Sequence, residues 1–354
     1  MTPLTRRRLQ NFRANRRGYV SLWLFCVLFL ASLFAEFIAN DRPIVFSLGG
    51  ELHFPVWFTY SEAELGGELL TEAFYRDPYV MDLIEADGWA LWPPVRFSHN
   101  TIDWGIADLP SPPDADHILG TDGGATDVFA KVLYGFRLSV LFGLSLTVAS
   151  SAIGVLVGAL QGYFGGLTDL LGQRLVEIWE GLPILFVLII LASVVEPNVF
   201  WLLAILSLFS WMALVGVVRA EFLRARNFEF VRAARALGVS NLVIMRKHVL
   251  PNATVAALTY LPFILTGAIT ILTFLDFLGF GLPYDSPSFG RLLSAAKANL
   301  QAPWLGITVF IALAVLLTLL IFIGEAVRDA LDPRRAIGPG ADVAGTQVQL
   351  QAGQ

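Results

Sequence analysis

Carboxylates in or beside long apolar runs are the first residues of this chain that could do chemistry. Asp276 lies near the end of the apolar run 254–280, and Glu180 lies in the run 174–195. A charged side chain at membrane depth is costly unless it faces a cavity or a partner, so such residues mark paths for cargo or ions. Because Asp276 is only a few residues from the end of its run, we expect it to be hydrated at the outer membrane surface. The candidates for a translocation path or gate are Glu180, Pro183, Asp276, Gly279 and Gly281.

The motifs of common catalytic classes are absent. The chain contains no Gly-x-x-x-x-Gly-Lys-Ser/Thr phosphate loop, no His-Glu-x-x-His and no Gly-x-Ser-x-Gly. Cys26 is the single cysteine and the four histidines are far apart in the sequence, so we expect neither a disulfide nor a metal site. We therefore predict a chain without catalytic residues, which binds no cofactor and does not hydrolyse ATP itself.

A basic segment between two apolar runs is the best candidate for binding another protein. It runs from Glu229 to Gly238 and is closed by Leu250-Pro251, with His248 just before them. A three- and four-residue spacing predicts a short helix with one small, apolar face, formed by Phe230, Ala233, Ala234 and Leu237.

The residues after that helix predict a turn and a second helix. Gly238 can take the left-handed conformation that ends a helix, and Ser240 or Asn241 can cap the next one. We expect Leu250-Pro251 to stop this second helix before the following apolar run. Such a helix–turn–helix could dock a soluble protein or rest on anionic lipid, and the spacing alone leaves both readings open.

The elements that must position these residues are membrane spans. The chain has 354 residues, of which 56% are hydrophobic and 15% charged, and a bilayer is crossed by roughly 20 apolar residues in a helix. We predict an all-α polytopic membrane protein with six spans, at 19–40, 138–163, 174–195, 198–219, 254–280 and 303–326. Gly181 and Pro183 permit a kink in the third span. In the second, close packing of a neighbouring helix is predicted by Gly143, Gly154, Gly158 and Gly162.

The distribution of charge orients the spans. Residues 1–18, the loop at about 221–253 and the tail 329–354 are rich in arginine, and cytoplasmic segments carry such an excess. Residues 41–130 instead carry sixteen acids against Arg42, Arg76 and Arg96. Their many aromatic residues indicate a folded extracytoplasmic insert. We therefore expect both termini in the cytoplasm, an acidic periplasmic insert, a five-helix core at 131–328, and outer loops near Pro197 and Pro287.

Several motifs carry a resemblance to a known family. Ala233-Ala234, Gly238 and Leu250-Pro251 resemble the EAA loop of ABC importer permeases, although the family often has Glu at Arg232 and Ile at His248. Features of the dipeptide and oligopeptide branch are Gly120-Thr121-Asp122 with Asp127-Val128, the run Phe277–Pro283 with Pro287–Gly290, and Arg328–Arg334. Ala125 and Thr126 replace the usual Gly and Arg of the first of these. The matches cover most of 118–335, and the insert with Tyr134–Ser139 looks most like the permeases of microcin C and oligopeptide importers.

This resemblance implies a function and a set of partners. It implies a non-catalytic bacterial inner-membrane permease that moves oligopeptides, including microcin C-like peptides, by alternating access. The implied partners are a second, different permease subunit, two ATPase domains or subunits that carry the ATP and magnesium, and a periplasmic substrate-binding protein, within the lipid bilayer and without nucleic acid. The insert would dock that binding protein or serve only as structure. An ion-coupled secondary transporter and a membrane sensor with a ligand-binding insert remain the alternatives.

Overall fold

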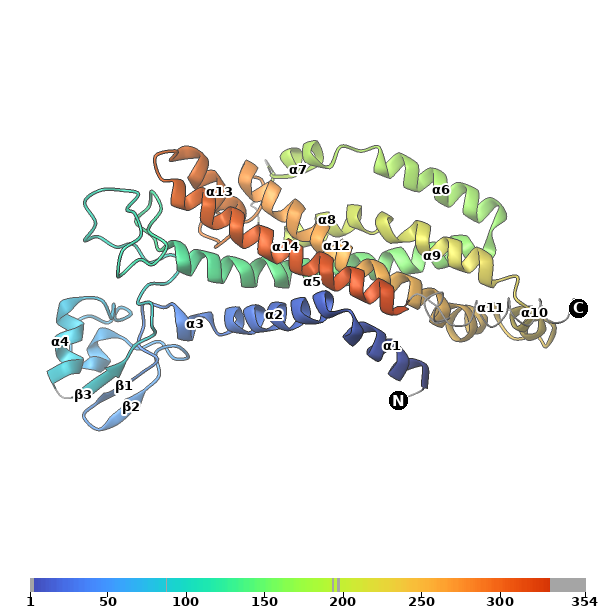
Figure 1. Cartoon of the computed structure of the whole chain (residues 1–354). Helices are drawn as coiled ribbons and strands as arrows, with labels where there is room; N and C mark the ends of the chain where they lie inside the picture. Colours follow the sequence, from blue (N-terminus) through green and yellow to red (C-terminus); the bar gives the residue numbers. More distant parts are fainter. Residues whose placement is uncertain (1–2, 87, 193, 196–197, 332–354) are drawn as a thin grey trace, which may run out of the picture.

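The computed structural model describes residues 3–331, except 87, 193, 196 and 197. Long helices lie side by side as a bundle, with a small mixed subdomain at one end (Figure 1). The prediction of a mostly helical chain is confirmed, but all-α is wrong in detail because the insert contains a sheet. The helices of the N-terminal part and the first core helix are α1 Pro3–Ala14, α2 Arg16–Leu33, α3 Ala35–Ile38 and α5 Val128–Phe164. The rest of the bundle consists of α6 Gly166–Glu180, α7 Ile184–Ala192, α8 Val199–Ser210, α9 Met212–Ala225, α10 Glu229–Ala236, α11 Asn241–Val243, α12 Leu250–Leu278, α13 Phe289–Ala298 and α14 Pro303–Leu331.

Among the described residues, four helical stretches are long and apolar enough to cross a membrane, and a bent pair makes up to five. The four are Arg16–Leu33, Val128–Phe164, Asn241–Leu278 and Pro303–Leu331, and the pair is α8 with α9, bent by 40°. The predicted third span is not one helix, because the chain breaks between Glu180 and Ile184, where the sequence predicts a kink. Pro197, placed in an outer loop by the sequence, lies outside the described residues.

Helix α5 begins ten residues before the predicted start of the second span. Asp127 is its N-cap, and the Asp127 carboxylate accepts a hydrogen bond of 2.7 Å from the backbone N–H of Ala130. This capping satisfies one of the unpaired N–H groups of the first turn. The aspartate of the predicted Asp127-Val128 motif therefore marks where the helix starts.

The close packing predicted for the second span is confirmed. A Cβ on Gly154, Gly158 or Gly162 would lie 2.5, 2.7 and 2.5 Å from the backbone carbonyl oxygens of Trp211, Val215 and Arg219. These carbonyls belong to the junction of α8 with α9 and to α9 itself. Glycine is thus required at three successive turns of α5, because any side chain would push α9 away.

The insert folds around a small core of its own. Strands β1 Val45–Leu48, β2 Glu51–His53 and β3 Gly88–Leu91 form an antiparallel sheet in the order β2-β1-β3, beside helix α4 Pro78–Ala86 and a 3-10 turn at Glu62–Leu65. Phe46, Leu65, Tyr75, Val80 and Ile84 are buried between them. From β3 the chain returns to the bundle through an irregular segment, 92–127.

That returning segment is fastened to the bundle. Val95 and Phe97 pack against Ala35 and Ala39 at the end of the first span and against Tyr134 of α5. The Val95 backbone also exchanges hydrogen bonds with Ile38 and Asn40, each 3.0 Å long. The insert is therefore held by its base rather than tethered by a flexible linker.

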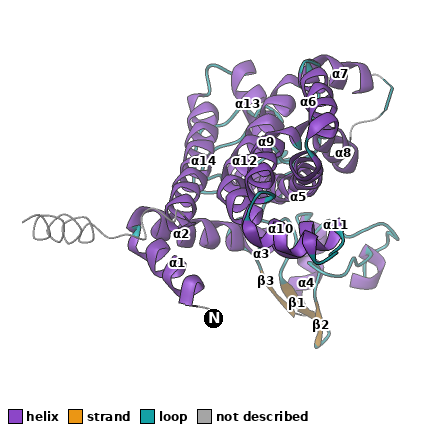
Figure 2. Ribbon diagram, turned by 90° about the vertical axis from the view of Figure 1, so that its right-hand side faces the viewer, coloured by secondary structure: helices purple, strands orange, loops and turns teal. Residues whose placement is uncertain are grey.

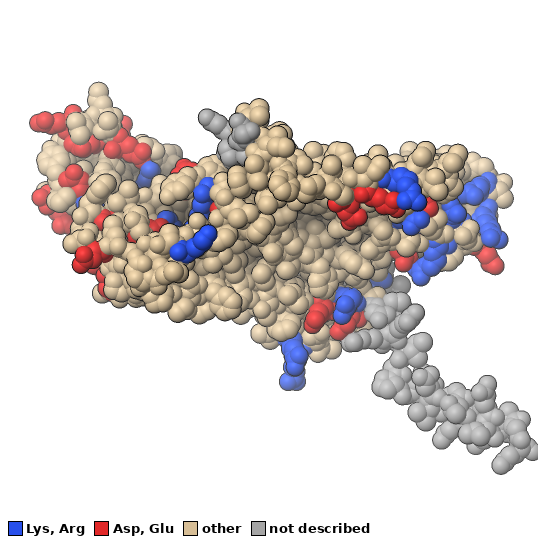
Figure 3. Space-filling view, turned by 90° about the horizontal axis from the view of Figure 1, so that it is seen from above, with Lys and Arg blue, Asp and Glu red and all other residues tan. Residues whose placement is uncertain are grey.

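The two ends of the molecule differ in charge. Helices α10 and α11 lie at the end opposite the insert and run across the ends of the long helices (Figures 1 and 2). Acidic side chains gather at the insert end and Lys and Arg at the α10 end (Figure 3). The tail motif Asp332-Pro333-Arg334, with Arg335, lies outside the described residues.

Candidate functional site

Helix α10 exposes one apolar face and buries another. Val231 and Ala234 point into a core cluster that includes Tyr163 and Phe222 of α5 and α9. Phe230 is 45% exposed and Leu237, at the C-cap, is 83% exposed, with Ala233 also at the surface. The prediction of a single face was therefore wrong, because Ala234 belongs to the buried side. The exposed set is Phe230, Ala233 and Leu237.

The turn at Gly238 has the geometry of a Schellman motif. Gly238 has φ +74°, its N–H donates to the carbonyl of Arg235 at 3.0 Å, and the N–H of Val239 donates to the carbonyl of Ala234 at 3.1 Å. This pair of bonds closes a helix end and needs a left-handed residue, which glycine adopts without strain. Apart from its chain neighbours, no atom of residues 3–331 that the structure describes lies within 4 Å of a Cβ built on Gly238. The expected conformation of Gly238 is confirmed.

The second helix does not stop at Leu250-Pro251, contrary to the prediction. Helix α11 passes through a π-helical stretch, Ile244–Val249, directly into α12, and the whole run Asn241–Leu278 is one continuous helical stretch that is long and apolar enough to contain a span. Pro251 stands in the first turn of α12, where a missing N–H costs least, and the wider π turn precedes it. Ser240 occupies the N-cap position of α11 without a side-chain bond.

Helices α10 and α11 and the turn at Gly238 between them form a corner. His248 and Leu250 line its inner side. The ring centroids of His248 and Phe230 are 6.5 Å apart, and Leu250 packs against the cluster that holds Val231. Pro251 is at the surface. Of the predicted loop residues, the structure thus brings Phe230 and His248 together on one side of the corner.

A cavity of about 460 Å³ opens beside α10. Tyr163, at the end of α5, donates from its hydroxyl to Asn241 Oδ1 at 2.8 Å, and the Arg235 guanidinium lies 5.5 Å from the centre of the Tyr163 ring. Arg226 also lines the cavity. These contacts join α11 to α5. The corner is therefore attached to the bundle at two places, through the buried face of α10 and through Asn241 of α11.

Asp276 is buried at the opposite end of α12, so the expected hydration is wrong. Its side chain is 1% exposed, and Oδ1 accepts a 2.6 Å hydrogen bond from the backbone N–H of Leu282. Gly279 ends the helix with φ +86°, and a Cβ on Gly281 would lie 1.8 Å from Asp276 Oδ1. The chain turns back over the carboxylate, and α13 packs against α12 and α14. Asp276, Gly279 and Gly281 therefore form one tight hairpin.

The other two path candidates lie elsewhere. Glu180 and Pro183 are both exposed, at the end of α6 and just before α7. In the described part of the chain the Glu180 carboxylate makes no hydrogen bond or ion pair with Asp276. The five path candidates are thus divided into a buried hairpin and an exposed break.

Sequence reasoning missed a buried polar network at the base of the insert. His117 is 1% exposed, with Nδ1 2.8 Å from Asp127 Oδ2 and Nε2 3.2 Å from Asp103 Oδ2. Burial alone would raise the pKa of Asp103, but hydrogen bonds from Gly105 and His117 and the charge of Arg76 hold it below its usual value. The dense acids around His117 were a signal in the sequence, although only the fold shows which of them meet it.

Two cross-helix ion pairs were also missed. Arg137 of α5 donates to both carboxylate oxygens of Glu36 in α3, at 2.8 and 2.9 Å. Arg219 of α9 pairs with Asp169 of α6 at 2.8 Å. No group of three or more His, Cys, Asp or Glu side chains in the described residues is arranged to hold a metal ion.

A bundle of membrane-capable helices with a basic corner at one end indicates an integral membrane protein. The chain belongs to the family of binding-protein-dependent transport system inner membrane components, whose match covers residues 154–337. Members are permease subunits of ABC transporters, multi-pass proteins of the inner membrane that leave ATP hydrolysis to a separate subunit.

Three relatives show where this chain belongs within the family. The chain is 58% identical to the Escherichia coli inner membrane ABC transporter permease protein YejE, over 95% of this chain and 99% of that one. It is 54% identical to the Agrobacterium fabrum peptidoglycan transport system permease protein YejE, over 94% of each. It is 35% identical to the Haemophilus influenzae oligopeptide transport system permease protein OppC, over 67% of this chain and 77% of that one.

Proposed function

We propose that this chain is the permease half of an ATP-driven oligopeptide importer and that the corner α10–Gly238–α11 receives the force from the ATPases. The observation that carries the proposal is the exposed face of Phe230, Ala233 and Leu237 on a helix whose other face is rooted in the bundle. Apolar side chains that protrude beside small residues suit a pocket on a protein partner. Import of peptides is supported by the names of the relatives, and microcin C-like peptides belong to the same proposal.

The continuity of α11 with α12 supports mechanical coupling. A displacement of α10 would act through the tight Gly238 turn on a helix that runs without a loop to Leu278. ATP binding with magnesium on the two ATPases would close them, pull the corner and rock the spans in the alternating-access sense. This chain contributes no atom to the hydrolysis.

Six spans, both termini in the cytoplasm and the insert in the periplasm are part of the same proposal. The spans would be α2, α5, α6 with α7, α8 with α9, α12 and α14. The gathering of basic residues at the α10 end supports this orientation. Six spans form half of a pore, so a second, different permease subunit would complete it, and a periplasmic binding protein would dock on the acidic insert.

Site-specific crosslinking tests the proposal. In a Cys26→Ser background, a photoactivatable crosslinker on Leu237→Cys should capture an ATPase subunit in membranes that contain the whole transporter. The matched control is Leu70→Cys, which is also exposed (88%) but lies in the insert. Crosslinks from position 237 to lipid alone would refute the coupling role and would return the ion-coupled transporter and the sensor to consideration.

A further inference from the structure

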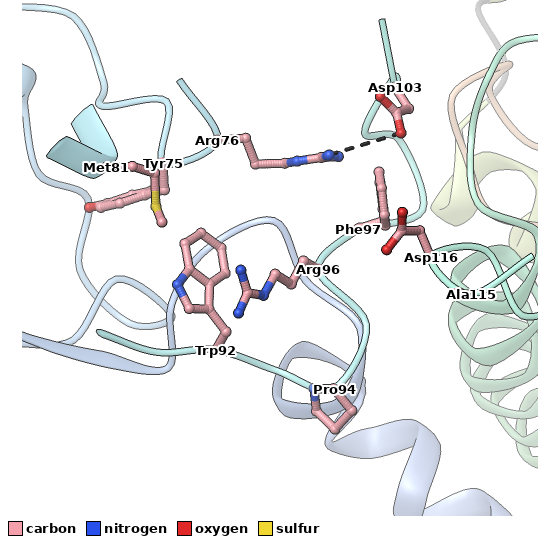
Figure 4. Close-up of a pocket in the computed structure, with 10 residues that line it drawn as sticks. All are labelled: Tyr75, Arg76, Met81, Trp92, Pro94, Arg96, Phe97, Asp103, Ala115 and Asp116. Atoms are coloured by element: carbon pink, nitrogen blue, oxygen red, sulfur yellow. Dashed lines mark ion pairs between the residues drawn. The ribbon is translucent and has the colours of Figure 1, made fainter. Parts of the chain in front are cut away.

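A cavity in the insert has the size and the lining residues of a separate binding site. It measures about 370 Å³ and lies at the end of the molecule opposite α10. The residues that matter for its chemistry are Arg76, Trp92, Arg96, Phe97, Asp103 and Asp116 (Figure 4). The volume falls in the range of small-molecule sites, roughly 300–1,000 Å³.

The cavity concentrates the scarce positive charge of the insert. Residues 41–130 contain three basic side chains before Lys131, and two of them, Arg76 and Arg96, line this cavity. The third, Arg42, lies outside it and is paired with Glu72. In a segment with sixteen acids, two arginines beside one cavity are not expected from composition alone.

Both guanidinium groups are held by aromatic rings, while their hydrogen-bonding edges are left largely unused. Arg76 lies 3.9 Å from the centre of the Phe97 ring, and Arg96 lies 5.1 Å from Trp92. Arg76 Nη1 is buried without a partner, and Nη2 is 4.0 Å from Asp103. Arg96 has no carboxylate partner within the described residues. Stacked arginines with free N–H edges are suited to bind a carboxylate.

The acidic residues of the cavity narrow the ligand class. Asp103 already accepts a hydrogen bond of 3.0 Å from Gly105 and lies beside His117. Asp116 is exposed on the side opposite Trp92, next to Phe97 (Figure 4). A phosphate dianion would be repelled by these two carboxylates, whereas an ammonium group would be attracted to Asp116. The arrangement favours a molecule that carries one carboxylate and one ammonium group.

We propose that this cavity binds a short zwitterionic peptide, with its carboxylate on Arg76 and Arg96, its ammonium group on Asp116, and an apolar side chain against Trp92. The peptide would occupy the insert before or beside the translocation path. The choice of a peptide as the ligand rests on the charges of the cavity. This proposal deepens the proposed import function and does not depend on coupling at α10.

Calorimetry on the purified full-length chain in nanodiscs, without ATPase or binding protein, tests the proposal. The probes are the dipeptide Ala-Phe, its C-terminal amide and its N-acetyl form. Loss of a charge-assisted hydrogen bond should weaken binding about ten- to a hundredfold, so the amide should bind that much more weakly than Ala-Phe. Equal binding of the acid and the amide, or no saturable binding of Ala-Phe up to about 1 mM, would overturn the proposal.

Three variants locate the binding. Arg96→Gln should weaken Ala-Phe about ten- to a hundredfold, whereas Arg42→Gln, the control outside the cavity, should leave it unchanged. Asp116→Asn should weaken Ala-Phe but not N-acetyl-Ala-Phe. Arg96 and Asp116 are both exposed, so folding should be preserved, and a melting curve checks this. Wild-type affinity in Arg96→Gln would contradict the site, and because no ATPase is present, that failure would leave the coupling proposal standing.

Discussion

Truncation of Leu237 to alanine is the sharpest test of the exposed face of α10. The side chain is 83% exposed in this chain, so its removal should change the free energy of unfolding by no more than about 0.5 kcal/mol. If an ATPase subunit buries it, nearly the full burial of a leucine, about 1.5–3 kcal/mol, is gained on binding. Leu237→Ala should then weaken the affinity for the ATPase about ten- to a hundredfold.

The measurement is biolayer interferometry of the purified permease in nanodiscs against its ATPase subunits, with a melting curve for each variant. Leu70→Ala, equally exposed but at the other end of the molecule, should bind as the wild type does. Val231→Ala removes two fully buried methyl groups and should cost about 1.6 kcal/mol of stability, which shows what a purely structural defect does to the assay. An unchanged affinity in Leu237→Ala would refute the idea that a partner grips this face.

Other perturbations test the remaining elements. Gly238→Val should strain the left-handed turn by about 1–2 kcal/mol and lower peptide uptake per ATP hydrolysed, whereas Gly238→Asn, which tolerates that conformation, should keep more of the coupling; equal coupling in both would refute the turn's role. Gly281→Ala should collide with Asp276 and destabilise the hairpin, and a melting temperature equal to the wild type would contradict the packing. Removal of residues 45–91, whose end residues Val45 and Leu91 are paired across the sheet, should abolish docking of the binding protein in a pull-down; full docking by the inserted protein would refute that role.

Predictions from the sequence were confirmed where the local geometry allows only one residue type, as it does for several glycines. Gly238 has a left-handed backbone, which the sequence indicated because this glycine follows a helical pattern. Gly154, Gly158 and Gly162 of the second span lie where α9 approaches the α5 backbone. Each of these depends on local geometry, which the sequence determines directly.

Prediction failed where a residue type allows two environments. Alanine fits a buried and an exposed face alike, so spacing could not show that Ala234 turns inward and Ala233 outward. Proline can end one helix or stand in the first turn of another, and at Pro251 the second holds. The burial of Asp276 depends on a hairpin that folds back over it, and the His117 network depends on segments fourteen residues apart that meet only in the fold.

The unbroken run from Asn241 to Leu278 has a further consequence. Its 38 residues, at about 1.5 Å each, reach at most roughly 57 Å, with the exposed corner at one end and the hairpin of Asp276 at the other. Because no loop lies between the two ends, a tilt imposed at one end passes to the other through continuous helical backbone, and the π-helical stretch Ile244–Val249 and Pro262 are the places where this backbone can bend. Opening of the path on one side of the membrane and its closure on the opposite side would then result from one movement of this helix.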